Sequence, residues 1–192
     1  MKVVLYGKAF GKDYDYLMRD MLRLLQESGV EIIVYESFLS DIKHCFDDEV
    51  NYAVLKKTDD IKGKADVLFS FGGDGTILHM AKAATKRGIP ILGVNIGTMG
   101  FMAELESNEM DKLKQIASGD YKIDRRMMLD VSVRRDKEVL YRDICLNDIA
   151  ITKGAVARIV HLSVRCDGVQ AMECGGDGII IATPTGSTAY NL

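Results

Sequence analysis

The sequence lacks several features that would place it in a common class of protein. No apolar run approaches 18 residues, so no segment reaches the length of a membrane-spanning helix, and we expect no membrane partner. None of the four cysteines lies in a CxxC pair, so a zinc ribbon or a thioredoxin-type site is not indicated, and reduced thiols in a cytoplasmic protein are expected. The net charge is only −3, which argues against a nucleic-acid partner held through its phosphates.

What the sequence does contain is the material of a globular protein. Its 192 residues are 47% apolar and 28% charged, enough for a packed core in one domain or two small ones. Proline occurs only 2 times, whereas glycine occurs 18 times and gathers in short clusters. The clusters at 72–75 and 175–178 both read GGDG, and they direct the search for a functional site.

The first hundred residues alternate between strand-like and helix-like segments. ADVLFSF is apolar almost throughout, as is typical of a parallel strand covered on both faces, and Leu17, Met21 and Leu25 recur on one helical face. This alternation predicts an open, mostly parallel α/β sheet with right-handed crossovers. We expect strands at 2–6, 31–36, 65–71 and 91–94, helices at 13–28 and 76–88, and over 37–64 an irregular connection with one short helix at 40–46.

The pattern changes after residue 100. One further helix is expected over 107–118, and from Tyr121 apolar and polar residues alternate, as they do in half-buried strands. Within such a stretch, Asp167-Gly168 supplies a two-residue hairpin turn. We therefore expect an α/β domain at 1–105, carrying the first GGDG loop, followed by a mainly antiparallel β domain at 106–192.

The loop Gly72-Gly73-Asp74-Gly75 lies between a buried strand and a helix. Glycines let a ligand approach the main chain, and the free N–H groups at the start of a helix suit phosphate oxygens. The loop therefore predicts a phosphate or nucleotide site, with simple helix capping by Asp74 or Thr76 as the alternative. It is neither a P-loop, which would end in GK[ST], nor the dinucleotide GxGxxG fingerprint.

Asp74 is the only carboxylate of this loop. Phosphoryl transfer to a hydroxyl needs a carboxylate that accepts the proton and holds the hydroxyl in line. A helix N-terminus favours the ionised form and so makes Asp74 a weaker base, but the loose transition state of this reaction needs little basicity. Asp74 is thus the candidate catalytic residue.

Other polar segments are candidates for the same ligand. NIGTMGF at 95–101 follows the next strand and would lie at the same sheet edge, unless it is an ordinary turn. Asn147 and Asp148 offer an amide and a carboxylate that suit an adenine edge and a ribose hydroxyl, although neighbours in a strand point to opposite faces and a buried hydrogen-bonded pair is the alternative. TPTGSTAY at 183–190 is rich in hydroxyls that could bind phosphate or sugar.

These motifs, in this order, resemble those of NAD kinases. GGDGT alone is also similar to loops of lipid kinases and phosphofructokinases, whereas TPTGSTAY after Asp177-Gly178 is highly specific. The resemblance covers nearly the whole chain and implies a two-domain NAD-kinase-like fold. It implies transfer of a phosphate from ATP or polyphosphate to the 2′-hydroxyl of the adenosine ribose of NAD, giving NADP. It also implies a divalent metal, usually Mg²⁺, and assembly into a homodimer or homotetramer.

The resemblance further implies roles for single residues. Asp74 would accept the proton, and no protein ligand for the metal is expected. Asp148 stands where the family often has Glu, and Gly175 where it often has a basic residue. By this resemblance, Gly72, Gly73 and Gly75 would contact the substrate, and His79 and Arg158 would contact phosphate. Asn147 and Asp148 would bind adenine and ribose, and Asp177 would face the nicotinamide half. The residues that would line the adenosine pocket are Thr185, Thr188, Ala189 and Tyr190.

Two alternatives stand beside the NAD kinase hypothesis. One is a lipid kinase of the diacylglycerol type with the same GGDGT loop, and the other is a nucleotide-binding sensor without catalysis, although a pure binder would not need Asp74. Family members continue beyond the position of Leu192. We therefore expect an incomplete β domain, exposed side chains such as Ile179 and Ile181, and little kinase activity from this chain alone.

Overall fold

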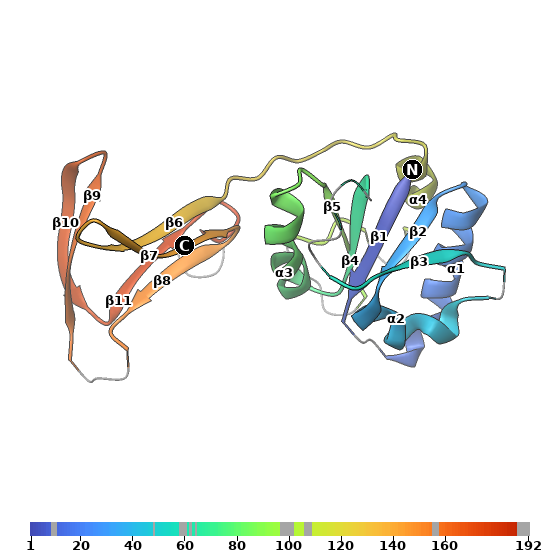
Figure 1. Ribbon diagram of the computed structural model, residues 1–192, viewed down its shortest axis with the longest axis horizontal. Helices are drawn as coiled ribbons and strands as arrows, with labels where there is room; N and C mark the ends of the chain where they lie inside the picture. Colours follow the sequence, from blue (N-terminus) through green and yellow to red (C-terminus); the bar gives the residue numbers. More distant parts are fainter. Residues whose placement is uncertain are drawn as a thin grey trace. The chain divides into compact units, whose positions relative to one another are not determined.

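The chain folds into two units, Met1–Asp124 and Arg125–Leu192 (Figure 1). The computed structural model describes residues 1–8, 11–47, 49–57, 61, 63, 65–96, 102–105, 109–154 and 158–187. The division lies later in the chain than the expected 105/106 boundary. Helix α4 (Lys112–Ala117) accounts for the difference, because its buried Leu113 belongs to the core of the first unit.

The first unit is built on a five-stranded sheet in the order β3-β2-β1-β4-β5. Each neighbouring pair is parallel, so the expected open parallel α/β sheet is confirmed. Val3, Val4 and Leu5 of the central strand are fully buried, since helices cover both faces of the sheet. The strands are β1 (Lys2–Gly7), β2 (Glu31–Tyr35), β3 (Tyr52–Leu55), β4 (Val67–Phe71) and β5 (Ile91–Val94).

Helices α1 (Asp15–Glu27) and α3 (Asp74–Thr85) cover opposite faces of this sheet. A Cβ on Gly93 would lie 2.6 Å from Ile77 of α3. Its neighbour Val94 instead lines a small apolar cavity with Leu17 and Met21 of α1. Because successive strand residues point to opposite faces, the two helices pack on different sides. Both expected helices are therefore confirmed, although α3 begins at Asp74, two residues before the start predicted from the sequence.

The segment between β2 and β4 holds more regular structure than its sequence indicates. Helix α2 (Glu36–Ile42) and a 3-10 turn, η2 (Lys43–Cys45), stand where a short helix was expected. Strand β3 was not expected. It has four residues, pairs only with β2 and leaves its two middle residues exposed, so it shows no buried alternation that a sequence pattern could reveal.

The sheet order creates a switch point between β1 and β4. The chain runs outward from β1 through β2 to β3, then returns to the other side of β1 to form β4 and β5. In open α/β sheets, ligands bind outside the carboxyl ends of the strands at such a point. The Gly72–Gly75 loop follows β4 at this position, and Gly7 at the end of β1 pairs with Phe71.

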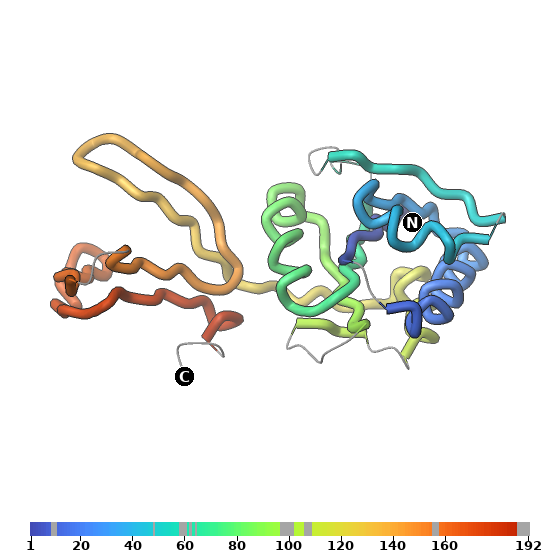
Figure 2. The backbone as a smooth tube through the Cα atoms, turned by 90° about the horizontal axis from the view of Figure 1, so that it is seen from below, coloured from blue at the N-terminus to red at the C-terminus, as the bar shows by residue number. Residues whose placement is uncertain are grey.

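The second unit consists, among its described residues, of two-stranded antiparallel sheets (Figure 2). The Asp167-Gly168 turn is confirmed, because both residues have positive φ, 50° and 82°. No apolar side chain described in this unit is fully buried: Ile181 is 43% exposed and Ile180 is 39% exposed. The hairpins are β6 (Leu129–Arg135) with β7 (Glu138–Cys145) and β9 (Val160–Cys166) with β10 (Val169–Gly176), and β8 (Asp148–Thr152) pairs with β11 (Gly178–Ala182).

Candidate functional site

The glycine loop at 72–75 combines one strained position with two open ones. Gly72 has φ of +136°, and a Cβ there would lie 2.5 Å from Oγ1 of Thr76, so only glycine fits. At Gly73 and Gly75 an added Cβ would meet no heavy atom within 4 Å, and both residues are exposed. The main chain is therefore accessible to a ligand at the start of α3, where free N–H groups favour phosphate oxygens.

Asp74 is the first residue of α3 and follows the N-cap residue Gly73. Its Oδ1 accepts a hydrogen bond from the main-chain N–H of Met102, at 3.1 Å. Residues 102–105 are held in place in turn, because the N–H groups of Glu104 and Leu105 both donate to the carbonyl of Gly93. The carboxylate is thus fixed in orientation beside the open loop.

The start of the 95–101 segment lies at the same sheet edge as the glycine loop. Strand β5 runs parallel to β4, and the N–H of Gly72 donates to the carbonyl of Val94 at 3.1 Å. Asn95 is 6% exposed, and its N–H donates to the carbonyl of Leu105. Residues 97–101 lie outside the described part of the chain, but the return of the main chain at Met102 to Asp74 ties this segment to the loop.

His79 projects from α3, and its ring stacks on Tyr6 at a centroid distance of 5.7 Å. Tyr6 also meets Tyr35 edge to face at 5.3 Å. Partial burial raises the pKa of the Tyr6 hydroxyl, so this phenol stays neutral. One face of the imidazole is therefore covered and its orientation limited. Sequence reasoning singled out His79 but missed Tyr6, which reads there as an ordinary strand residue.

In the second unit, the structure brings together two of the candidate segments. Asn147 lies in the bend before β8 rather than within the strand, and its Nδ2 donates to Oδ2 of Asp148 at 3.1 Å. The two side chains therefore do not diverge as neighbours within a strand would, and they form the hydrogen-bonded pair that was the alternative interpretation. The N–H of Thr183 donates to the carbonyl of Asn147 at 2.8 Å, and a Cβ on Gly186 would lie 2.3 Å from that same oxygen.

Thr183 organises the hydroxyl-rich segment. Its side chain is buried, and its hydroxyl donates to the carbonyl of Leu146 while accepting the N–H of Gly186 at 3.1 Å. Thr185 follows on the surface of this turn and is half-buried. Thr188, Ala189 and Tyr190, the remaining residues expected to line the adenosine pocket, lie outside the described residues.

Asp177 occupies the connection between β10 and β11 and is held by a lysine that the sequence did not single out. Nζ of Lys153 lies 2.7 Å from Oδ1 of Asp177, and the N–H of Lys153 donates to the carbonyl of Asp177. The carboxylate is 80% exposed. Arg158 is also exposed, ahead of β9, and Gly175 lies beside the His161 ring.

Family models account for both units of the chain. Residues 8–121 match the ATP-NAD kinase N-terminal domain, and residues 146–192 match the ATP-NAD kinase C-terminal domain. This chain belongs to the NAD kinase family. The family relationship agrees with the order of motifs in the sequence.

Relatives and a solved structure of this family are similar to the whole chain. NAD kinase from Syntrophotalea carbinolica is 35% identical over 100% of this chain and 65% of its own length, and that from Carboxydothermus hydrogenoformans is 39% identical over 94% and 57%. NAD kinase from Acetivibrio thermocellus is 42% identical over 70% of this chain and 47% of the relative. The chain thus spans about half to two thirds of the length of these relatives. The crystal structure of yeast NADH kinase complexed with NADH has a TM-score of 0.83 and 26% identity, covering 99% of this chain and 59% of that one.

The NAD kinase glycine loop offers a single carboxylate to a metal. Mg²⁺ is commonly bound by one or two carboxylates together with substrate phosphates and water. Asp74 fits that pattern, since it is fixed at the start of α3 beside open main chain. Within the described ranges, three or more potential metal ligands come together only at Asp15, His44 and Cys45, away from this loop.

None of the helices described here has the length and apolar character needed to cross a membrane.

Proposed function

We propose that this protein transfers the terminal phosphate of ATP to the 2′-hydroxyl of the adenosine ribose of NAD, yielding NADP and ADP. The observation that carries the proposal is the loop after β4, where a fixed Asp74 carboxylate stands beside the open Gly73 and Gly75 in a member of the NAD kinase family. Polyphosphate is the second candidate donor. NADH is the second candidate acceptor, because the yeast neighbour is named an NADH kinase.

Asp74 serves this reaction as the proton acceptor. As the bond between the ribose O2′ and the γ-phosphorus forms, the bond from that phosphorus to the bridging oxygen breaks, and ADP leaves with the electron pair. The proton of the 2′-hydroxyl passes to the carboxylate of Asp74. The hydrogen bond from Met102 keeps that carboxylate oriented, and positioning supplies much of the catalysis in phosphoryl transfer.

The phosphates are held by main chain and by charge. The N–H groups at the start of α3 and the open Gly73 and Gly75 bind phosphate oxygens, and His79 and Arg158 contribute contacts to phosphate. Asp74, together with the substrate phosphates, would hold a divalent cation such as Mg²⁺, which would supply neutralisation of the phosphate charge.

The acceptor is recognised through its adenosine half. Asn147 takes the adenine edge and Asp148 the ribose hydroxyls, with their mutual hydrogen bond setting the geometry of both. Asp177, oriented by Lys153, takes the nicotinamide half. The adenosine pocket is completed by Thr185, Thr188, Ala189 and Tyr190. A homodimer or homotetramer in the cytoplasm remains part of this proposal.

The decisive experiment measures NADP formed by the complete gene product from NAD or NADH with Mg²⁺ and either ATP or polyphosphate. Asp74→Asn should lower turnover roughly 10²–10⁴-fold, the usual contribution of a positioned acid–base group, while NAD binding changes only a few-fold. Asp136→Asn is the matched control, because Asp136 occupies a hairpin turn with φ of 54°, which asparagine also adopts. Near-normal turnover of Asp74→Asn, or no NADP from either donor, would refute the proposal.

A further inference from the structure

A cluster of metal-ligating side chains lies outside the glycine loop. Asp15 opens α1, while His44 and Cys45 belong to the 3-10 turn η2. One ligand atom from each residue lies within 4.8 Å of the other two. Nε2 of His44 is 2.8 Å from Oδ2 of Asp15. A carboxylate, an imidazole and a thiol thus converge from two elements that are well separated in the sequence.

Burial and charge at this cluster favour a cation. Cys45 is 1% exposed, and its sulfur lies within 4.8 Å of a carboxylate oxygen of Asp15. A negative charge beside a buried sulfur is an arrangement that a divalent cation stabilises, since the cation attracts the carboxylate and converts the thiol to thiolate. The His44 side chain is 51% exposed, so the cluster is open to solvent on one side.

One neighbouring charge opposes a cation. This charge is the guanidinium of Arg19, which donates to the carbonyl of His44 at 2.8 Å and lies 4.0 Å from Oδ1 of Asp47. The Asp47 carboxylate therefore offsets part of the Arg19 charge, and the guanidinium is held by the main chain of η2.

We propose that Asp15, His44 and Cys45 form a binding site for a thiophilic divalent cation of the Zn²⁺ type. Zinc is bound by thiolate, imidazole and carboxylate ligands in tetrahedral geometry, and three protein ligands leave a fourth position for water. Bonds of about 2.0–2.1 Å place tetrahedral nitrogen and oxygen ligands about 3.4 Å apart. His44 and Asp15 therefore separate slightly from their 2.8 Å contact, a movement that the exposed His44 side chain allows.

Binding exchanges one set of interactions for another. The cation displaces the Cys45 proton to solvent and replaces the direct contact between Nε2 of His44 and Oδ2 of Asp15. Because the ligands come from α1 and η2, the bound cation fixes the start of α1 to the turn that follows α2. Binding to the folded state alone also raises its stability.

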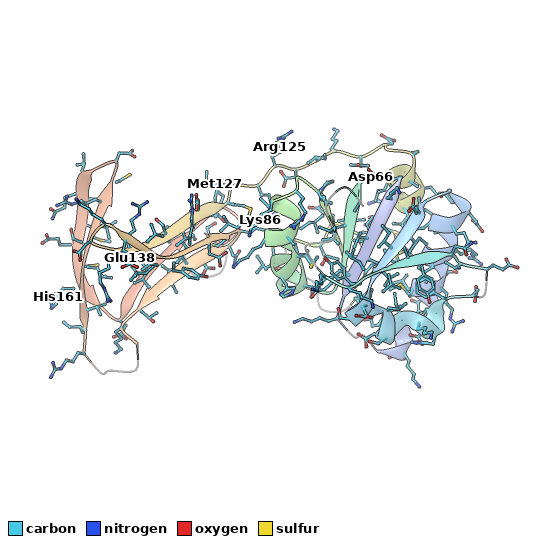
Figure 3. All side chains as sticks on the ribbon, viewed as in Figure 1. Asp66, Lys86, Arg125, Met127, Glu138 and His161 are labelled. Atoms are coloured by element: carbon cyan, nitrogen blue, oxygen red, sulfur yellow. The ribbon has the colours of Figure 1, made fainter. Side chains whose placement is uncertain are left out.

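The test uses the untagged 192-residue chain, freed of metal with a chelator and titrated with Zn²⁺ against a chromophoric competitor. We expect one equivalent to bind. His44→Gln keeps a polar group facing Asp15 on an exposed position, so it should fold normally, yet it should weaken Zn²⁺ binding at least about 10-fold. Cys45→Ser should do the same. His161→Gln and Cys166→Ser remove the same residue types from exposed positions of β9, where Figure 3 labels His161, and should leave binding unchanged.

Cobalt gives a readout that reports the sulfur directly. With Co²⁺, the wild-type chain should show the near-ultraviolet charge-transfer absorption of a thiolate–cobalt bond, because the cation binds Cys45 as the thiolate. If Cys45→Ser fails to fold, the Zn²⁺ affinity of His44→Gln and the cobalt spectrum of the wild-type chain still test the proposal. Absence of stoichiometric binding, binding unaffected by His44→Gln, or a cobalt spectrum without thiolate absorption would each overturn the proposal.

Discussion

Gly72 and Gly73 are adjacent, yet only Gly72 has a backbone conformation that needs glycine. Gly72 has φ of +136° and faces Thr76, whereas Gly73 is extended and open. We expect Gly72→Ala to lower the free energy of unfolding by about 1–3 kcal/mol through backbone strain. Gly73→Ala should change it by less than about 0.5 kcal/mol. Urea unfolding of the two variants measures the difference.

The variants Gly72→Ala and Gly73→Ala also test whether phosphate contacts the main chain of the glycine loop. A methyl group on Gly73 would occupy the space through which a phosphate reaches the main chain, so Gly73→Ala should reduce NADP formation at least about 10-fold despite a normal urea midpoint. Full activity in this variant would show that the donor does not approach the loop there. Equal stability losses in the two variants would instead show that the observed φ of Gly72 is not needed.

Asn147 is expected to bind the adenosine half of the acceptor, NAD. Asn147→Ala should weaken NAD binding by about 1–3 kcal/mol, since it leaves a polar group of the ligand without its partner. ADP-ribose should lose the same affinity, because both ligands share the adenosine half. Calorimetric titration of each ligand measures this, with the exposed Asn51→Ala as control. A loss for NAD but not for ADP-ribose would place Asn147 at the nicotinamide end.

Single residues also show where sequence reasoning stops. Asp74 is the predicted catalytic residue because it is the only carboxylate of the glycine loop and phosphoryl transfer to a hydroxyl needs one. Its partner, the N–H of Met102, carries no side-chain signal, since any residue other than proline presents the same main-chain donor. Lys153 was missed for a related reason: its ion pair with Asp177 joins residues whose proximity depends on the pairing of β8 with β11.

At the scale of elements, prediction succeeded where burial imposes a clear period. The fully buried β4 and the one-sided α1 were both found, and so was the hairpin turn at Asp167-Gly168. Strand β3 was missed, because an edge strand of four residues depends on hydrogen bonds to β2 more than on its own side chains. The order of the strands also followed from tertiary pairing and not from any local pattern.

The β6–β7 hairpin allows a prediction about pH. Hydrogen bonds and charge from Arg142, at 2.8 Å, hold the pKa of the Asp130 carboxyl below its ordinary value of 3.8. The folded hairpin therefore binds fewer protons than the unfolded chain in this range. The contribution of the pair is complete above about pH 3.8 and is lost as the pH falls through the lowered pKa.

An NMR titration of the Asp130 carboxyl carbon tests this directly. In Arg142→Gln the pKa should return upward to the ordinary value, whereas Arg134→Gln, which alters an exposed arginine on the same strand as Asp130, should leave it low. Because the pair is exposed to solvent, high salt should also move the wild-type pKa upward. An unchanged pKa in Arg142→Gln would show that the ion pair does not form in solution.

At the scale of the whole molecule, the apolar core is confined to the first unit. The buried hydrophobic side chains among the described residues lie between Val3 and Leu113. In the second unit, side chains such as Val133 and Tyr141 are 49% and 55% exposed. Since burial of apolar surface is the main favourable term in folding, the two units should differ greatly in their resistance to opening.

Limited proteolysis should expose this difference. Residues 120–127 are exposed and outside any helix or strand, and Figure 3 labels Arg125 and Met127 in this segment. Trypsin should cut first after Lys122, Arg125 or Arg126, because cleavage requires an extended, accessible main chain. The product containing the first unit should persist, whereas the second unit should be degraded further, since its strands lack a protected core.

The surviving product should also fold by itself. Its sheet, its helices and the buried Leu113 all lie before the cleavage points, so its thermal unfolding should remain cooperative, with a midpoint close to the main transition of the intact chain. Arg126→Gln alone should not abolish the cut, because Lys122 and Arg125 remain; replacing all three should. First cleavage inside 65–96, or loss of cooperative unfolding in the product, would mean that the first unit depends on the second for its stability, contrary to the confinement of the core.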